Sequence, residues 1–173
     1  MLFRSNLELE YILKAAQLLP NYEFIFTGGK PIAVEYWKDW CEAREIKNAV
    51  FTGYIHNYQE IKYYQFAADV LVSYYTRQGH DVNYNFPNKI CEYMLTGNPL
   101  VTPNYSATQD ILNEHNCFFV APENEEALAK TIDLAIKDEE KAAILSSQAR
   151  FDVQQNTFKI RVNNIIEFLE RNE

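Results

Sequence analysis

Apolar and polar residues follow two alternating patterns along this chain. In several segments the apolar residues recur every three or four positions, as on the buried face of an amphipathic helix. Between these segments lie short apolar runs, which are typical of buried strands. The runs YEFIFT, AVFT, DVLVSY, PLVT and CFFV predict strands at 22–27, 49–52, 69–74, 99–102 and 117–120. Helices are predicted at 6–20, 34–45, 59–67, 88–95, 106–113, 125–136, 139–150 and 157–170.

Strands that alternate with helices favour a Rossmann-like, doubly wound parallel α/β sheet. Ligands of such sheets bind outside the carboxyl ends of the strands, so the loops that follow the strands are expected to gather on one rim. These loops are 28–29, 54–55, 75–86 and 105–106. The loop 75–86 is long and polar, which favours a role in ligand binding.

The segment 83–101, NYNFPNKICEYMLTGNPLV, predicts a loop, a helix and a buried strand in succession. Pro87 suits the start of a helix, and Gly97 suits the left-handed residue that ends one. Where a loop opens into a helix, backbone N–H groups and the positive end of the helix dipole can hold phosphate. Lys89 and Glu92 lie in the first turn and a half. Lys89 is compatible with a phosphate contact and with an ordinary surface lysine. Glu92 is compatible with a contact to hydroxyl groups and with a solvated helix glutamate.

Composition narrows the class of protein. The chain has 173 residues, 47% of them hydrophobic and 23% charged, which indicates one globular domain. Its net charge of -8, without a basic stripe, argues against a nucleic-acid partner. Cys41, Cys91 and Cys117 lack metal-ligand spacing and are expected to be reduced core thiols of a cytoplasmic protein. No apolar run approaches the roughly 20 residues that cross a bilayer, and the first ten residues lack a signal-peptide core.

Histidines and aromatic residues add little specific chemistry. His56 and His115 have no partners in metal-ligand spacing, so no metal site is expected. The 12 Tyr and 11 Phe residues are scattered through the predicted strands and helices, and we expect most of them in the core.

Several short motifs occur in a characteristic order. They are FTGG after the first strand, FTGYI after the second, the ADV of residues 68–70, the spaced block P-x-K-x-x-E-Y-M-x-x-G-x-P-x-V of residues 87–101, and Asp110–Ile111 followed by FFVAP. This order resembles the C-terminal, donor-binding domain of GT-B fold glycosyltransferases, specifically the retaining family 4. The resemblance covers nearly the whole chain.

The resemblance implies a single nucleotide-sugar-binding domain over 1–173. It would be the donor-binding half of a retaining hexosyltransferase that moves a sugar from a UDP- or GDP-sugar to an acceptor hydroxyl, without a metal cofactor. Polysaccharide, lipopolysaccharide or glycolipid synthesis is the expected setting. Lys89 would offset charge on the leaving phosphate, and Glu92 would hold the nucleotide ribose. The implied donor-binding residues are Gly28, Gly29, Tyr54, Ile55, Asp81, Asn88, Lys89 and Glu92.

The sequence departs from the family pattern at two places, and both departures change what we expect of the donor site and of the domain boundaries. The first of the family's two spaced glutamates falls on Tyr84, and Asp81 of the same loop is the proposed substitute. Family domains also open with a mid-sheet strand and a basic loop, whereas only MLFR precedes the first helix here, with Arg4 as the last trace of that loop.

We therefore expect this chain to be an excised domain of a longer enzyme and to be inactive alone. Helix 157–170 would reach toward an absent N-terminal domain that binds the acceptor sugar or glycolipid. The full enzyme would be cytoplasmic, with peripheral contact at the inner face of the membrane.

Two other functions remain open. A non-catalytic α/β nucleotide-binding or protein-interaction module would explain Tyr84 as a sign of lost activity. A GT-B epimerase would need acid and base groups in the cleft, for which the loop offers His80 and Asp81.

Overall fold

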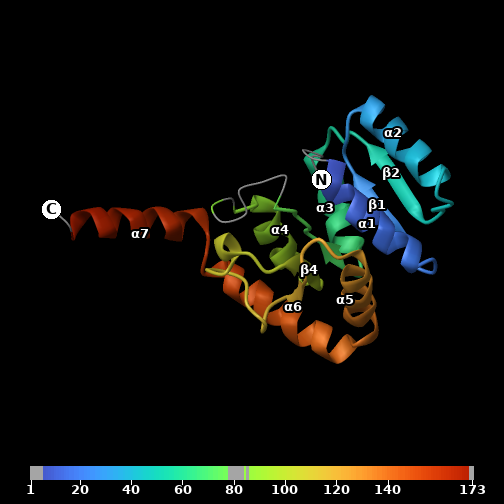
Figure 1. Cartoon of the computed structure of the whole chain (residues 1–173). Helices are drawn as coiled ribbons and strands as arrows, with labels where there is room; N and C mark the ends of the chain where they lie inside the picture. The colour runs from blue at the N-terminus through green and yellow to red at the C-terminus, as the bar shows by residue number, and fades with distance from the viewer. Residues whose placement is uncertain (1–5, 78–83, 85, 172–173) are drawn as a thin grey trace.

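The computed structural model describes residues 6–77, 84 and 86–171 (Figure 1). Helices surround short parallel strands, as expected for an α/β domain. The elements are α1 (Asn6–Leu18), β1 (Phe24–Thr27), α2 (Pro31–Glu42), β2 (Ala49–Gly53), α3 (Tyr58–Ala67), β3 (Leu71–Val72), α4 (Asn88–Thr96), β4 (Leu100–Pro103), η1 (Ser106–Thr108), β5 (Phe118–Val120), α5 (Glu125–Lys137), α6 (Glu139–Gln154) and α7 (Phe158–Glu170).

The strands form two sheets. β1 pairs with β2, and β4 lies between β3 and β5, with every pairing parallel. The expected parallel architecture is confirmed, but the single five-stranded sheet is not formed. Adjacent strands must lie about 4.8 Å apart to share hydrogen bonds. Within the described ranges no strand connects β1 to β3, which is the mid-sheet region where the family resemblance implies an additional strand.

A hydrophobic core joins the two sheets. Leu9 and Leu13 of α1 are completely buried. They belong to one cluster with Phe24 and Phe26 of the first sheet, and Val101 and Phe118 of the second belong to it as well. Burying a leucine of this kind stabilises a fold by about 1.5–3 kcal/mol. α1 therefore connects the two sheets by packing.

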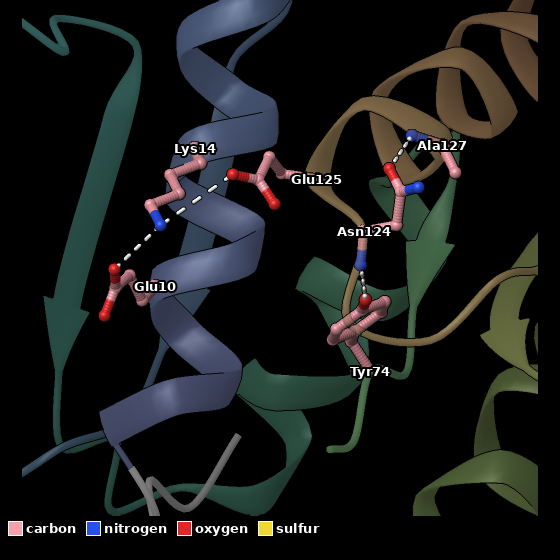
Figure 2. A network of polar contacts seen from close by, with 6 residues as sticks. All are labelled: Glu10, Lys14, Tyr74, Asn124, Glu125 and Ala127. Atoms are coloured by element: carbon pink, nitrogen blue, oxygen red, sulfur yellow. Dashed lines mark hydrogen bonds and ion pairs between the residues drawn. The ribbon is translucent and has the colours of Figure 1, made fainter. Parts of the chain in front are cut away.

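Polar contacts attach the start of α5 to α1 and β3 (Figure 2). Lys14 lies 2.9 Å from Glu10 and 3.8 Å from Glu125. The Asn124 side chain caps α5 by accepting a hydrogen bond from the N–H of Ala127 (2.8 Å), and the Asn124 N–H donates to the Tyr74 hydroxyl (3.2 Å). These contacts place the amino end of α5 beside the carboxyl end of β3.

Several element boundaries differ from the sequence prediction. α2 begins at Pro31, whose fixed φ suits a first helical position, and ends at Glu42, before Glu45 turns the chain with a φ of 57°. β3 is limited to two residues. Segment 106–113 contains only the short 3₁₀ helix η1. β3 pairs with β4 through Leu71 and Val72.

The expectation that most aromatic residues lie in the core holds for about half of the described tyrosines and phenylalanines, of which five are buried and six more pack, partly buried, against the core clusters. Among the described residues, more tyrosine and phenylalanine side chains are exposed than buried. Many of the exposed ones lie on α3 and α7, two helices without a fully buried residue. Few elements pack against α3 and α7, so amphipathic spacing alone did not bury their aromatic side chains.

α7 stands apart from the rest of the fold (Figure 1). Its amino end is capped by Thr157, whose side chain accepts from the N–H of Ile160 (3.3 Å). Val162, Ile165 and Leu169 on its apolar stripe are all exposed. Packing of this stripe therefore contributes little to the stability of the described fold.

Asn48 is expected to stabilise the turn after α1. Its side-chain amide donates to the carbonyls of Ala16, Leu19 and Tyr22 at 2.8–2.9 Å. Asn48→Ala removes this donor from all three carbonyls, although those of Ala16 and Leu19 keep a backbone N–H partner. It should lower the free energy of unfolding by about 1–3 kcal/mol in urea denaturation. Lys47→Ala, at the exposed neighbouring position, should change it by less than about 0.5 kcal/mol. Equal effects of the two variants would contradict this role.

Substitutions on α7 should leave stability nearly unchanged. Ile165→Ser removes an exposed side chain, so the free energy of unfolding should stay within about 0.5 kcal/mol of wild type. Leu9→Ala, in the core, should lower it by about 2–5 kcal/mol. A loss above about 1 kcal/mol for Ile165→Ser would show that α7 packs against this domain.

Candidate functional site

The amino end of α4 has no side-chain cap. Pro87 occupies the N-cap position, and its carbonyl accepts the first hydrogen bond from the N–H of Ile90 (3.0 Å). Asn88, in the first turn, is exposed. A helix start of this kind presents N–H groups and a positive partial charge to an anion.

Lys89 turns inward from this first turn. Its Nζ lies 4.4 Å from the centre of the Tyr75 ring, just beyond the carboxyl end of β3. Burial lowers the pKa of Lys89 to about 8, and the carboxylate of Glu8 opposes this by favouring the charged form. Glu8 belongs to the first turn of α1 and is only 2% exposed. The Lys89 ammonium is therefore partly desolvated, and its charge is sensitive to mild alkali.

Glu92 contacts α3. The amide of Gln65 donates to Oε2 of Glu92 at 3.1 Å. The Tyr58 hydroxyl hydrogen-bonds to the same carboxylate, which raises the pKa of Tyr58. Glu92 is half-buried, so it is not a freely solvated helix residue. An ionised carboxylate has about four acceptor positions, so capacity remains for further donors.

Glycines join the ends of β1 and β2. Gly28 and Gly29 both have a φ of 100°, which is accessible to glycine at low energy. The N–H of Gly28 donates to the carbonyl of Gly53 at 2.9 Å. Tyr54 follows directly, is 63% exposed, and Ile55 is half-buried. This loop leads into α3, whose first residue contacts Glu92.

The ends of the other three strands also meet. The Tyr105 hydroxyl, after β4, donates to the carbonyl of Tyr75 at 2.9 Å. The N–H of Arg77 donates to Oε1 of Glu123, which follows β5, at 3.1 Å. Glu123 has a φ of 56°, which turns the chain at this point. Loops after β3, β4 and β5 thus form a continuous rim beside Lys89.

The structure places the predicted residues in two groups. Lys89 and the uncapped start of α4 lie with the ends of β3 to β5, and the glycine pair lies with Tyr54 at the ends of β1 and β2. Tyr58 connects the groups through Glu92. Tyr84 is 85% exposed. The predicted residues Arg4 and Asp81, and His80 of the epimerase alternative, lie outside the described residues.

Sequence reasoning missed the residues that hold Lys89 and Glu92. Glu8 resembles any polar residue of an amphipathic helix, and no sequence signal indicates its burial. Tyr58 and Gln65 are seven residues apart, which places them on one face of α3. The sequence shows this spacing, but it does not show which element packs against this face of α3.

The described residues contain no grouping of metal-ligating side chains and no membrane-spanning helix. Within the described ranges, no three His, Cys, Asp or Glu side chains are grouped where they could hold a metal ion. No helix in the same ranges has both the length and the apolar content needed to cross a membrane. The thiols of Cys41, Cys91 and Cys117 are unpaired, with Cys41 and Cys117 buried, and burial raises the pKa of Cys117 to about 12.

The sequence profile of one family, described as glycosyl transferases group 1, matches residues 3–152. The chain belongs to this family. The match ends before α7, so the group 1 region comprises both sheets and the helices α1 to α6 almost completely. No curated protein sequence matches the chain significantly.

Solved structures confirm the GT-B fold for this group 1 domain. Anabaena HepE in complex with UDP is 21% identical with a TM-score of 0.78, over 98% of this chain and 47% of HepE. Sucrose-phosphate synthase from Thermosynechococcus elongatus is 18% identical with a TM-score of 0.75, over 96% of this chain and 43% of the synthase. The C-terminal domain of LpcC, a group 1 family protein from Francisella tularensis, is 16% identical with a TM-score of 0.70, over 89% of this chain and 81% of that domain. The chain thus spans about half the length of HepE.

The pKa of Lys89 can be measured directly. In a ¹³C NMR titration of the lysine Cε resonances, Lys89 should titrate near pH 8. Lys137, whose hydrogen bond to Asp133 raises its pKa, should stay charged over the same interval. Glu8→Gln removes the attraction that favours the ammonium, so the pKa of Lys89 should fall further. Titration of Lys89 above pH 10 would contradict the buried placement.

Proposed function

We propose that this chain is the donor-binding part of a retaining glycosyltransferase. The full enzyme moves a sugar from a UDP- or GDP-sugar to an acceptor hydroxyl, with polysaccharide, lipopolysaccharide or glycolipid synthesis as its setting. The observation that carries the proposal is the position of Lys89 and Glu92 on the first turns of α4 in a group 1 domain, with Lys89 beside the Tyr75 ring that follows β3. The complex of HepE with UDP, a protein of similar fold, supports a nucleotide ligand.

The proposed chemistry depends on stabilising the leaving group. The bond between the anomeric carbon and the diphosphate breaks while the acceptor oxygen bonds to the same face of the sugar. Negative charge accumulates on the diphosphate, whose leaving oxygen takes up the proton of the acceptor hydroxyl. The Lys89 ammonium and the amino end of α4 offset that charge, so no metal ion is required. Arg4 is proposed as a second cation for the same phosphates. This half of the enzyme supplies no general base.

The remaining contacts would orient the donor. Gly28 and Gly29 allow the nucleotide to approach the backbone closely, because a glycine has no Cβ. Tyr54 and Ile55 would frame the base. Asn88 would contact phosphate, and Glu92 would accept hydrogen bonds from the ribose hydroxyls.

The acceptor is proposed to bind elsewhere in the full enzyme. The chain spans about half of HepE, and the exposed apolar stripe of α7 is proposed to contact an N-terminal domain. Alone, this chain would bind the donor without transferring the sugar. Cytoplasmic location, with peripheral membrane contact through the full enzyme, is part of the same proposal.

Nucleotide titration followed by NMR tests the donor site. UDP or GDP should shift resonances around Lys89 and Glu92, because the diphosphate and ribose lie against α4. Lys89→Met should weaken the affinity about tenfold, equivalent to about 1.4 kcal/mol, through loss of a charge-assisted contact. Lys130→Met, at an exposed position on α5, is the matched control and should bind as wild type does. Absence of shifts near α4 with both nucleotides would overturn the assignment.

A further inference from the structure

α3 contacts the Glu92 carboxylate with two side chains. Gln65 donates its amide N–H to Oε2 at 3.1 Å, and the Tyr58 hydroxyl bonds to the same group. The two residues are seven positions apart, about two helical turns, so both side chains project from one face of α3. Glu92 is therefore held from two points on a neighbouring helix.

Both donors are uncharged. They restrict the carboxylate without cancelling its charge, which a lysine or arginine partner would do. Lys62 of the same helix lies with its Nζ 5.1 Å from the centre of the Tyr58 ring. Glu92 consequently keeps its negative charge and its remaining acceptor positions for hydroxyl donors.

A third contact fixes α3 against α4. Asn98 follows Gly97, the left-handed residue that ends α4, and its amide donates to the carbonyls of Gln65 (3.0 Å) and Phe66 (3.2 Å). α3 has no fully buried side chain, so apolar burial contributes little to its placement. The polar contacts hold the backbone of Gln65 at the same position from which its side chain reaches Glu92.

We propose that Tyr58 and Gln65 are positioning residues that orient Glu92 toward the ribose hydroxyls of the donor nucleotide. They thereby set the preference of the site for ribose over deoxyribose. The inference rests on the proposed function of Glu92 as the ribose contact. It extends the donor site to α3, a helix that none of the sequence motifs includes.

Tyr58 and Gln65 would strengthen ribose recognition because they preorganise the Glu92 side chain. A free glutamate side chain samples several rotamers, and ordering it on binding reduces affinity. Glu92 is ordered before the nucleotide arrives, with acceptor positions unoccupied. Loss of either donor leaves the charge in place but frees the side chain, so hydroxyl recognition should weaken while phosphate binding persists.

Comparison of ribonucleotides with deoxyribonucleotides tests the proposal. The 173-residue chain is titrated by calorimetry with UDP and GDP and with their 2′-deoxy and 3′-deoxy counterparts. Wild type should prefer the ribonucleotide over at least one deoxy form by about fivefold or more, the effect of about one hydrogen bond to a charged group. Tyr58→Phe and Gln65→Leu should each reduce this ratio at least twofold, and Glu92→Gln should bring it close to one.

Matched controls lie on the same helix. Tyr63→Phe repeats the loss of a hydroxyl at a side chain that is 69% exposed, and Gln59→Leu repeats the loss of an amide at an exposed position. Both should keep the wild-type ratio. A purely structural role of Tyr58 or Gln65 would change the affinities for all forms equally and leave the ratio unchanged.

The outcomes separate this inference from the function on which it rests. If Glu92→Gln removes the preference while Tyr58→Phe and Gln65→Leu keep it, the positioning role is overturned and the donor site stands. If wild type binds the nucleotides but does not distinguish either deoxy form, the ribose role of Glu92 fails together with this inference. If wild type binds no nucleotide, the proposed donor site itself fails.

Discussion

The packing of α1 is the constraint on which the rest of the domain depends. The described strands form two separate sheets, so no shared hydrogen-bonded ladder holds them in register. Instead, the buried leucines of α1 belong to one core cluster with residues of both sheets, and Lys14 connects the same helix to α5. Because apolar packing has no directional preference, the polar contacts around Tyr74 and Asn124 are needed to define how α5 meets β3.

The position of α1 also determines the electrostatics near α4. Glu8 is carried into the interior by the same helix that presents Leu9 to the core, and from there it acts on the Lys89 ammonium. Burial and the attraction to Glu8 have opposite effects on the charge of Lys89, and burial is the larger. The site thus combines a cation with a lowered pKa and a carboxylate on the next turn, each held by a different helix.

Local sequence signals predicted the helix at the centre of this site. The helix was expected over 88–95 and is observed over Asn88–Thr96, between Pro87 and a left-handed Gly97. The loop 28–29 was expected after the first strand, and its two glycines do follow β1, each with a positive φ. Apolar periodicity did not predict the environment of every element correctly. α7 has helical spacing and exposed apolar residues. The β3 ladder covers only Leu71 and Val72 of the apolar run 69–74.

The sequence by itself determined the α/β class, the order of the elements, the bounds of α4 and the choice of Lys89 and Glu92 as candidates. Periodicity, Pro and Gly act on neighbouring residues, so one chain segment contains the whole signal. Only the tertiary structure decided that the strands divide into two sheets, that the buried Glu8 favours the charged form of Lys89, and that Gln65 holds Glu92. Those are contacts between residues far apart in the chain, and burial and hydrogen-bond partners at such distances depend on how the helices pack.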